Sequence, residues 1–248
     1  MLFITGDTHG DWMSRLNVNA FPEQKEMTKD DYVLILGDFG LWHDTKQERY
    51  NLDWLEDKPF TTLFVSGNHE NYDRLDNYPV EEWNGGKIQK IRSSIYHLMR
   101  GEVFTIEGKT FFTFGGASSH DIKDGILEKD DPRLKTWRYD YTKMFRINHL
   151  SWWKRELPSD EEMNNGIKNL DLYNNKVDYI ITHSPYTSLL SQMDGHTGLY
   201  KSDYLTDYLQ EIKQNTDYKI WFFGHMHINK QFQWEKSICL YEQIIRIL

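Results

Sequence analysis

An apolar run that ends in glycine and aspartate, at Asp31–Gly40, constrains the fold of this chain more than any other stretch. The run Val33–Leu36 is too short for a helix and rich in branched side chains, which predicts a strand buried on both faces. Gly37 then permits a tight turn, and Asp38 follows at the carboxyl end of the strand. In open α/β sheets, binding and catalytic residues gather at this edge.

Four other apolar runs of the sequence also end in Asp, Asn or His. They lie within Leu2–Gly10, Thr62–Glu70, Tyr179–Pro185 and Ile220–His227. An ordinary turn explains a single Gly-Asp after a strand, but it does not explain five strands that end alike. The sequence therefore predicts that oxygen and imidazole ligands meet at one edge of a sheet.

Length and composition favour one globular domain, 1–248. The 248 residues can bury roughly 70–75% of their unfolded surface, and a hydrophobic content of 39% with nine tryptophans can supply the core. The net charge of −9 argues against broad electrostatic binding to nucleic acid or to an anionic membrane. A small phosphorylated substrate is still compatible, because bound metals would supply positive charge locally.

The cysteine content and the hydropathy predict a soluble cytoplasmic protein. Cys239 is the only cysteine, so an internal disulfide is impossible, which suits a reducing compartment. Residues 1–10 lack the features of a signal peptide, and no apolar stretch is long enough to span a membrane. We therefore expect no membrane partner, and the oligomeric state is left open.

The first part of the chain alternates between strand and helix patterns, which predicts right-handed parallel crossovers. In the helices, Met13 and Leu16 and then Tyr50, Trp54 and Leu55 are expected to face the core. The predicted elements are the strands Leu2–Thr5, Val33–Leu36 and Thr62–Val65 and the helices Asp11–Leu16 and Asp44–Asp57.

Short apolar runs separated by turn residues follow in the middle of the chain. Arg100-Gly101 and Glu107-Gly108 predict hairpin turns, so we expect an antiparallel extension of the first sheet or a second sheet packed on it. Ala117–Lys135 has no clear period and is long for a structureless loop, which predicts a lid or specificity loop. The three apolar runs are Ile95–Leu98, Val103–Ile106 and Phe111–Phe114.

The last part of the chain is predicted to add helices and closing strands. Thr142–Leu157 carries large apolar side chains up to Pro158 and is interpreted as helical. Ser159, followed by three acidic residues, begins the next helix, and Ser202 caps a later one of period 3.6. Ser237–Leu248 is predicted to form closing strands.

Taken together, the five strand ends resemble the signature of the calcineurin-like metallophosphoesterases. That signature is Gly-Asp-x-His, Gly-Asp, Gly-Asn-His-(Asp/Glu), a later His and Gly-His-x-His, and only the combination is specific. The resemblance implies an α/β sandwich of two mixed β-sheets flanked by helices, with a dimetal site at the carboxyl edge of the strands. The matching residues are Gly6–His9, Gly37-Asp38, Gly67–Glu70, His183 and Gly224–His227.

By this resemblance, seven side chains hold two divalent metal ions. Asp38 is implied to bridge both, because two cations roughly 3.5–4 Å apart need a shared anionic ligand. Imidazole and carboxylate ligands without thiolate suit Mn, Fe, Zn or Ni better than Ca, and we favour Mn. One ion is implied at Asp7, His9 and His227, and the other at Asn68, His183 and His225.

The resemblance also implies hydrolysis of phosphomonoesters or small phosphodiesters. The ions would clamp the phosphoryl oxygens and acidify a bridging water, whose hydroxide attacks phosphorus. Beside Asp38, the implied catalytic residue is His69, which would protonate the leaving alkoxide instead of binding metal. Asn68, His120 and His196 are candidate substrate contacts, the two histidines because they lie in irregular segments that could face the site.

One departure from the family pattern bears on the alternatives. Phosphoprotein phosphatases carry Gly-Asp-x-Val-Asp-Arg-Gly at the second motif, whereas this chain has Leu41 and Trp42 in place of the Asp and Arg. This weakens a protein serine/threonine phosphatase and leaves the orientation of His69 unexplained. A nuclease should show a basic groove or a capping domain, and a non-catalytic metal-binding scaffold has typically lost part of the ligand set.

Overall fold

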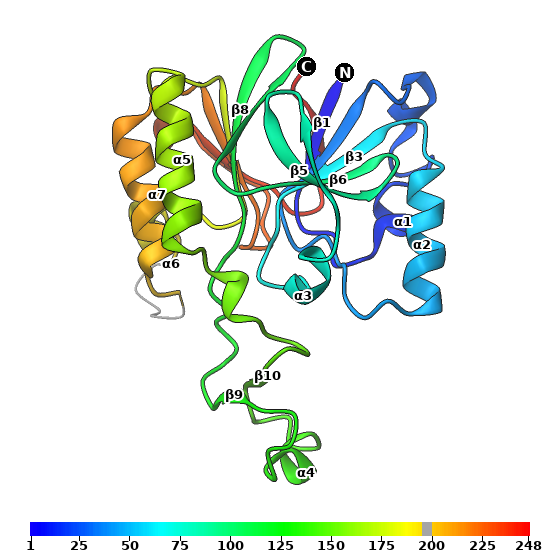
Figure 1. Ribbon diagram of the computed structural model, residues 1–248, viewed down its shortest axis with the longest axis vertical. Helices are drawn as coiled ribbons and strands as arrows, with labels where there is room; N and C mark the ends of the chain where they lie inside the picture. Colours follow the sequence, from blue (N-terminus) through cyan, green and yellow to red (C-terminus); the bar gives the residue numbers. More distant parts are fainter. Residues whose placement is uncertain (195–199) are drawn as a thin grey trace.

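A computed structural model describes residues 1–194 and 200–248. Two β-sheets pack face to face, and helices cover the outer face of each, which gives the four layers visible in Figure 1. One side carries α1 (Trp12–Arg15) and α2 (Lys46–Glu56), and the other carries α5 (Asp160–Leu172), α6 (Thr187–Asp194) and α7 (Tyr204–Asn215). The sandwich of two mixed sheets that the resemblance implied is therefore confirmed.

The first sheet has the order β15-β1-β2-β3-β6-β5-β4. Its strands β1, β2 and β3 are parallel, as the alternating pattern predicted. Strand β6, expected in an antiparallel extension or a second sheet, instead pairs with β3 in parallel, and the remaining pairs are antiparallel. The strands are β1 (Leu2–Thr5), β2 (Tyr32–Ile35), β3 (Thr61–Phe64), β4 (Val80–Trp83), β5 (Gly86–Arg92), β6 (Ile95–Leu98) and β15 (Ile244–Arg246).

The second sheet has the order β13-β14-β12-β11-β8-β7. Its centre, β14-β12-β11-β8, is parallel, and one antiparallel strand flanks it on each side. The strands are β7 (Glu102–Ile106), β8 (Lys109–Phe114), β11 (Tyr179–Thr182), β12 (Ile220–Phe223), β13 (Lys230–Phe232) and β14 (Ser237–Cys239).

Strand β2 shows why a continuous apolar run is needed at the centre of such a sandwich. Val33 and Ile35 pack beneath the helices of the first sheet, whereas Leu34 and Leu36 pack between the two sheets. All four side chains are fully buried. Because successive side chains of a strand point to opposite faces, only an uninterrupted run can fill both layers.

The hairpin predicted at Arg100-Gly101 is wrong. Strand β6 pairs with β3 in the first sheet, and β7 pairs with β8 in the second, so this segment crosses between the sheets. Arg100 is buried there and donates to the carbonyl oxygens of Gly115, Arg155 and Glu156. These bonds, which the sequence did not reveal, fix the crossing, whereas the hairpin at Glu107-Gly108 is confirmed.

Several helix predictions also need correction. Trp12 is fully buried in α1 while Met13 is only half-buried, and in α2 Leu52 is buried while Tyr50 is 60% exposed. The N-cap of α7 is Asp203 instead of Ser202, because its carboxylate accepts from the backbone N–H of Thr206 at 2.8 Å. Strands β4 and β5 were not predicted. The residues of β4 are largely exposed, and in β5 the polar residues Lys87, Gln89 and Lys90 interrupt the apolar pattern.

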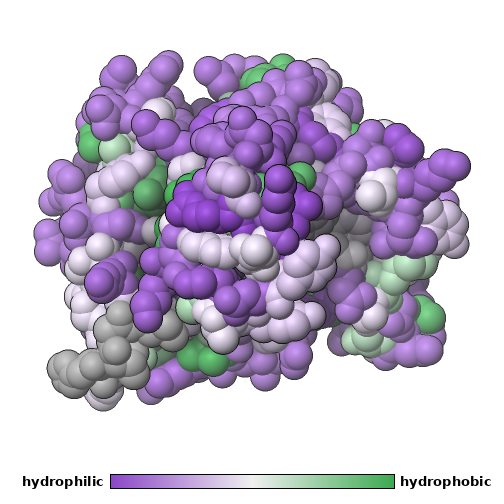
Figure 2. Space-filling view, turned by 90° about the horizontal axis from the view of Figure 1, so that it is seen from below, coloured by the Kyte–Doolittle hydropathy of each residue, from purple (hydrophilic) through white to green (hydrophobic). Residues whose placement is uncertain are grey.

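The segment 117–157 leaves the sandwich as a projection, drawn at the bottom of Figure 1. It contains β9 (Gly125–Leu127), α4 (Leu134–Trp137) and β10 (Phe145–Ile147), and β9 pairs with β10 in parallel. The predicted helix at Thr142–Leu157 is therefore wrong, because its large apolar side chains lie in a short strand and in turns. Figure 2, which looks onto the projection from below, shows a largely hydrophilic face.

Within residues 1–194 and 200–248, the helices are too short or too polar for any of them to cross a bilayer.

Candidate metal centre

The ends of five parallel strands meet at one edge of the sandwich and bring the predicted ligands together. Strands β1, β2 and β3 belong to the first sheet, and β11 and β12 to the second, so the site lies where both sheets end. The five apolar runs that end in Asp, Asn or His predicted this position. The strand ends supply Asp7 and His9, Asp38, Asn68 and His69, His183, and His225 and His227.

Two glycines explain why the motifs place Gly directly before a ligand. A Cβ atom at Gly67 would lie 2.0 Å from Asp38 Oδ1, and a Cβ atom at Gly224 would lie 2.2 Å from Asp7 Oδ1. No side chain fits at such distances. Each carboxylate can therefore lie against the backbone of the neighbouring strand end only because that residue is glycine.

The backbone at the site is strained at four ligand positions. His9, Asp38, His225 and His227 all have positive φ values, between 43° and 66°. Residues other than glycine rarely adopt this conformation, and surrounding structure must hold them in it. One such restraint is the buried carboxylate of Glu70, which accepts from the backbone N–H groups of Phe39 and Leu41 and so fixes the turn after Asp38.

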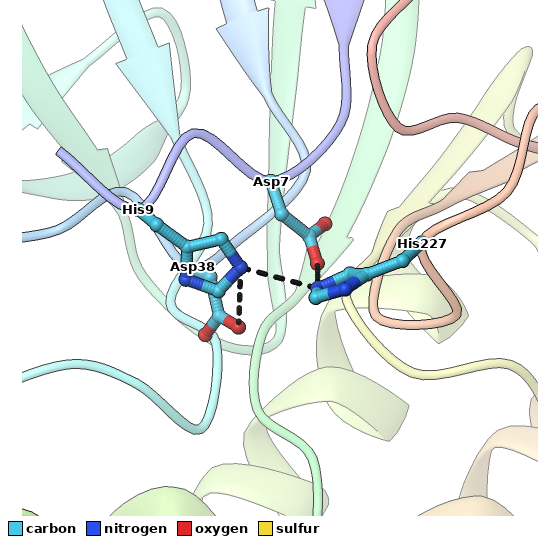
Figure 3. A group of neighbouring side chains, drawn as sticks. All are labelled: Asp7, His9, Asp38 and His227. Atoms are coloured by element: carbon cyan, nitrogen blue, oxygen red, sulfur yellow. Dashed lines mark hydrogen bonds and ion pairs between the residues drawn. The ribbon is translucent and has the colours of Figure 1, made fainter. Parts of the chain in front are cut away.

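Four side chains form a compact group that could hold one cation (Figure 3). One ligand atom from each of Asp7, His9, Asp38 and His227 lies within 4.8 Å of the others. His9 Nε2 and His227 Nε2 are 3.1 Å apart, and His227 Nε2 is 3.2 Å from Asp7 Oδ2. Imidazole nitrogens and carboxylate oxygens that converge in this way suit a divalent transition metal.

The other predicted ligands gather on the His183 side of Asp38. His183 Nε2 lies 3.5 Å from Asp38 Oδ1 and 3.3 Å from Asn68 Oδ1. His183 Nδ1 lies 2.7 Å from the carbonyl oxygen of Leu36, which can accept its proton and leave Nε2 facing the site. The rings of His183 and His225 are 5.0 Å apart. Asp38 thus lies between the two sets, as expected for a shared ligand.

The two carboxylates of the centre, Asp7 and Asp38, favour positive charge beside them. Burial alone would raise the pKa of Asp38, but the neighbouring His183 lowers this pKa below its ordinary range. Burial likewise opposes a charge on His183, yet Asp38 and Asp7 raise the pKa of His183 to about 9. A divalent cation would supply the positive charge that these two carboxylates favour, so the residues present fit bound metal.

A chain of hydrogen bonds holds Asn68. Its Nδ2 donates to Ser119 Oγ at 3.3 Å, and Ser119 donates its hydroxyl to Glu156 Oε2 at 2.7 Å. The backbone N–H of Ser119 donates to Glu156 Oε1 at 2.8 Å. All three residues are buried. This arrangement turns the amide oxygen of Asn68 toward His183.

His69 lies at the edge of the centre. Its backbone N–H donates to Asp38 Oδ1 at 2.7 Å, and its ring lies 5.6 Å from that of Trp42. The rings of His9 and His69 are 5.5 Å apart, and Arg146 also lies against the His69 ring, with Nη1 3.4 Å from Nδ1 and Nη2 3.4 Å from Nε2. Burial, with the charge of Arg146, lowers the pKa of His69 to about 4.

A cavity of about 650 Å³ opens beside His225. His120, predicted as a substrate contact, lines it together with Tyr200, Lys201 and Leu190, and the rings of His120 and His225 are 5.9 Å apart. The projection contributes one wall, which agrees with a role of Ala117–Lys135 beside the site. The other predicted histidine contact, His196, lies outside the described residues.

Sequence reasoning missed the residues that support Asn68 and His69. Ser119, Asp121, Arg146 and Glu156 all come from the projection, and no motif marks them. Asp121 adjoins His120 in a segment expected to be irregular, so proximity along the chain was the one available signal.

Comparison with known proteins places the chain in a family. A family model described as calcineurin-like phosphoesterase matches residues 2–229. No curated protein gives a significant match to the sequence.

Two solved structures are similar in fold. Phosphopantetheinyl hydrolase from Mycobacterium tuberculosis is 16% identical, with a TM-score of 0.49 over 97% of this chain and 87% of that chain. A protein from Staphylococcus aureus assigned as a 5'-nucleotidase is 15% identical, with a TM-score of 0.43 over 97% of this chain and 48% of that chain. The chain thus spans about half of the second protein.

Proposed function

The chain belongs to the calcineurin-like phosphoesterase family, and on that basis we propose that it hydrolyses phosphomonoesters or small phosphodiesters with the help of two divalent metal ions. The convergence of two aspartates, four histidines and Asn68 at the ends of five strands is the observation that carries the proposal. A second observation supports a small substrate, since a cavity of about 650 Å³ adjoins the centre.

Each side chain has a proposed role. Asp7, His9 and His227 hold one ion, and Asn68, His183 and His225 hold the other. Asp38 is the shared ligand and keeps its negative charge through its contact with His183. When bound, the two ions would neutralise phosphoryl charge and activate a water nucleophile.

The remaining candidates contact the substrate. Asn68 and His120 line the approach to the phosphoryl group, and His69 donates a proton to the leaving oxygen. We propose Mn as the metal, because the ligands are oxygen and nitrogen atoms without thiolate. A cytoplasmic location fits a single cysteine, Cys239, that is buried.

A substrate screen with defined metals tests the proposal. Purified protein loaded with Mn, Fe, Zn or Ni is assayed on phosphomonoesters, phosphodiesters, nucleotides, a phosphopeptide and DNA. We expect turnover of small esters that Asp38→Asn abolishes and that Lys176→Ala retains, because Lys176 is exposed and precedes β11, whereas the site lies beyond the other end of that strand. Hydrolysis of DNA or of the phosphopeptide alone would favour a nuclease or a protein phosphatase. Metal binding without turnover of any ester would indicate a scaffold.

A further inference from the structure

Two N–H donors of Arg146 face the ring of His69, and hydrogen bonds to this ring cannot satisfy both of them. Nη1 and Nη2 each lie 3.4 Å from a different ring nitrogen of His69. A neutral imidazole has one acceptor nitrogen, so at most one of these contacts can be a hydrogen bond. In the other contact, a guanidinium N–H faces the N–H of the ring, and two donors cannot form a hydrogen bond with each other.

Asp121 holds Arg146 in this place. Arg146 Nε donates to both carboxylate oxygens of Asp121 at 2.9 Å, and Nη2 donates to the same carboxylate. Nη1 makes a long contact of 3.4 Å to the carbonyl oxygen of Ser151. Of the five N–H groups of a guanidinium, one on each Nη atom is then left with His69 as its neighbour among the described residues.

We propose that Arg146 binds the non-bridging oxygens of the substrate phosphoryl group through these two N–H groups. The inference rests on the proposed phosphoesterase function. A guanidinium presents paired donors in a planar fork that matches phosphate oxygens, and the clamp of Asp121 orders the fork before substrate arrives. The Arg146 side chain is 17% exposed, so it is shielded but still open to a ligand at the centre.

Arg146 lies near the same ring as Trp42, the residue at the departure in the second motif. Trp42 lies where the phosphoprotein phosphatases carry an arginine, and its ring is 5.6 Å from His69 without offering positive charge. Charge on a transferring phosphoryl group spreads over its three equatorial oxygens and needs donors at fixed positions. Arg146 supplies those donors from the projection.

Titration of the Mn-loaded protein with orthophosphate tests the proposal without turnover. Because Arg146→Ala would lose hydrogen bonds between charged groups, we expect it to bind orthophosphate roughly 10- to 100-fold more weakly than the wild-type protein. The affinity of Arg146→Lys should lie in between. The matched control is Arg133→Ala, which removes an exposed Arg–Asp pair from the same projection. It should bind like the wild-type protein, and the metal content of all variants should be equal.

Kinetics then distinguishes phosphate binding from an effect on His69. If Arg146 binds phosphoryl oxygens, Arg146→Ala should lower kcat/KM equally for aryl and alkyl esters, by roughly 10²–10³-fold, and added guanidinium should restore part of the rate. A loss confined to alkyl esters, with orthophosphate affinity unchanged, would show that Arg146 only positions His69 and would overturn the proposal.

The two proposals fail in different ways. Wild-type turnover with an unaffected Arg146→Ala variant overturns the role of Arg146 alone. Orthophosphate binding that depends on Arg146, in a protein that hydrolyses no ester, supports the anion site and overturns the phosphoesterase function. A wild-type protein that holds metal but binds no orthophosphate overturns the role of Arg146.

Discussion

Asn68 is tied to Ser119, 51 positions later in the chain, by a hydrogen bond of 3.3 Å from its Nδ2 atom to the serine hydroxyl. The bond joins a residue of the sheet edge to the base of the projection. Because an amide can present either its oxygen or its nitrogen, this contact selects the oxygen for the centre.

Ser119→Ala should therefore weaken the metal held on the Asn68 side. Loss of an outer hydrogen bond to a ligand typically costs 10- to 100-fold in metal affinity. Metal titration should show one weakened site and one nearly unchanged site, while the exposed Ser188→Ala variant leaves both intact. Equal weakening of both sites would mean that the serine supports the fold of the whole centre.

Asp38→Asn should lower the metal content at both positions, whereas His9→Ala should empty mainly one. The reason is that Asp38 lies between the two sets of ligands, while His9 belongs to one. Metal analysis of the purified variants after incubation with excess Mn measures the effect. A wild-type protein that never holds more than one ion per chain would contradict the two-metal centre.

Removal of metal should lower the melting temperature. Asp7 and Asp38 are buried side by side at one sheet edge, and a cation bound to the native state alone stabilises that state by mass action. At a free metal concentration of about 100 times Kd, one site contributes about 2.7 kcal/mol, which corresponds to roughly 5–10 °C for a chain of this size. Scanning calorimetry with and without chelator measures the shift, and it should nearly vanish in Asp38→Asn.

Buried His97 should make stability depend on pH. Its Nδ1 lies 2.8 Å from Gln89 Oε1, its Nε2 has no hydrogen-bond partner in the structure described, and burial lowers its pKa to about 3. In the unfolded chain His97 has an ordinary pKa of about 6.5, so below that pH it binds a proton that the native state does not bind. The contribution of His97 to the free energy of unfolding is therefore fully present above about pH 6.5 and is lost as the pH falls toward 3.

Because of His97, the free energy of unfolding should fall by about 2 kcal/mol between pH 7 and pH 5. His97→Asn keeps a donor toward Gln89 but cannot take up the proton, so its stability should fall less over this range. Urea unfolding at several pH values measures the difference, with the exposed His43→Asn as the control. Parallel curves for the wild-type protein and His97→Asn would exclude His97 as the source.

Sequence patterns predicted the centre of this fold better than its edges. The run Val33–Leu36 is buried on both faces, and that requirement leaves a clear signature in the sequence. Strand β4 lies at a sheet edge and its side chains are largely exposed, so no apolar pattern in the sequence predicts it. Arg100 shows a second limit, because a buried charge that satisfies distant carbonyl groups resembles an ordinary turn residue in the sequence.

The same distinction applies to the candidate site. Ligands such as Asp7 and His227 follow strand ends, where the order of elements brings them together, so their meeting could be predicted. Arg146 and Glu156 reach the site through the irregular path of the projection, which neither periodicity nor a motif determines. Supporting residues of this kind are found only from the three-dimensional structure.

The last prediction concerns the proton that the leaving group needs. With a pKa lowered to about 4 by burial and by Arg146, His69 is neutral at pH 7 before substrate arrives. A phosphate group beside it would favour the charged imidazolium, so His69 could then donate a proton. His69→Asn should keep both metals and slow alkyl esters by roughly 10²–10⁴-fold, but aryl esters with good leaving groups should lose little. Rates for a series of esters of graded leaving-group pKa measure this. Equal slowing across the series, at full metal content, would show that His69 positions phosphate instead of donating a proton.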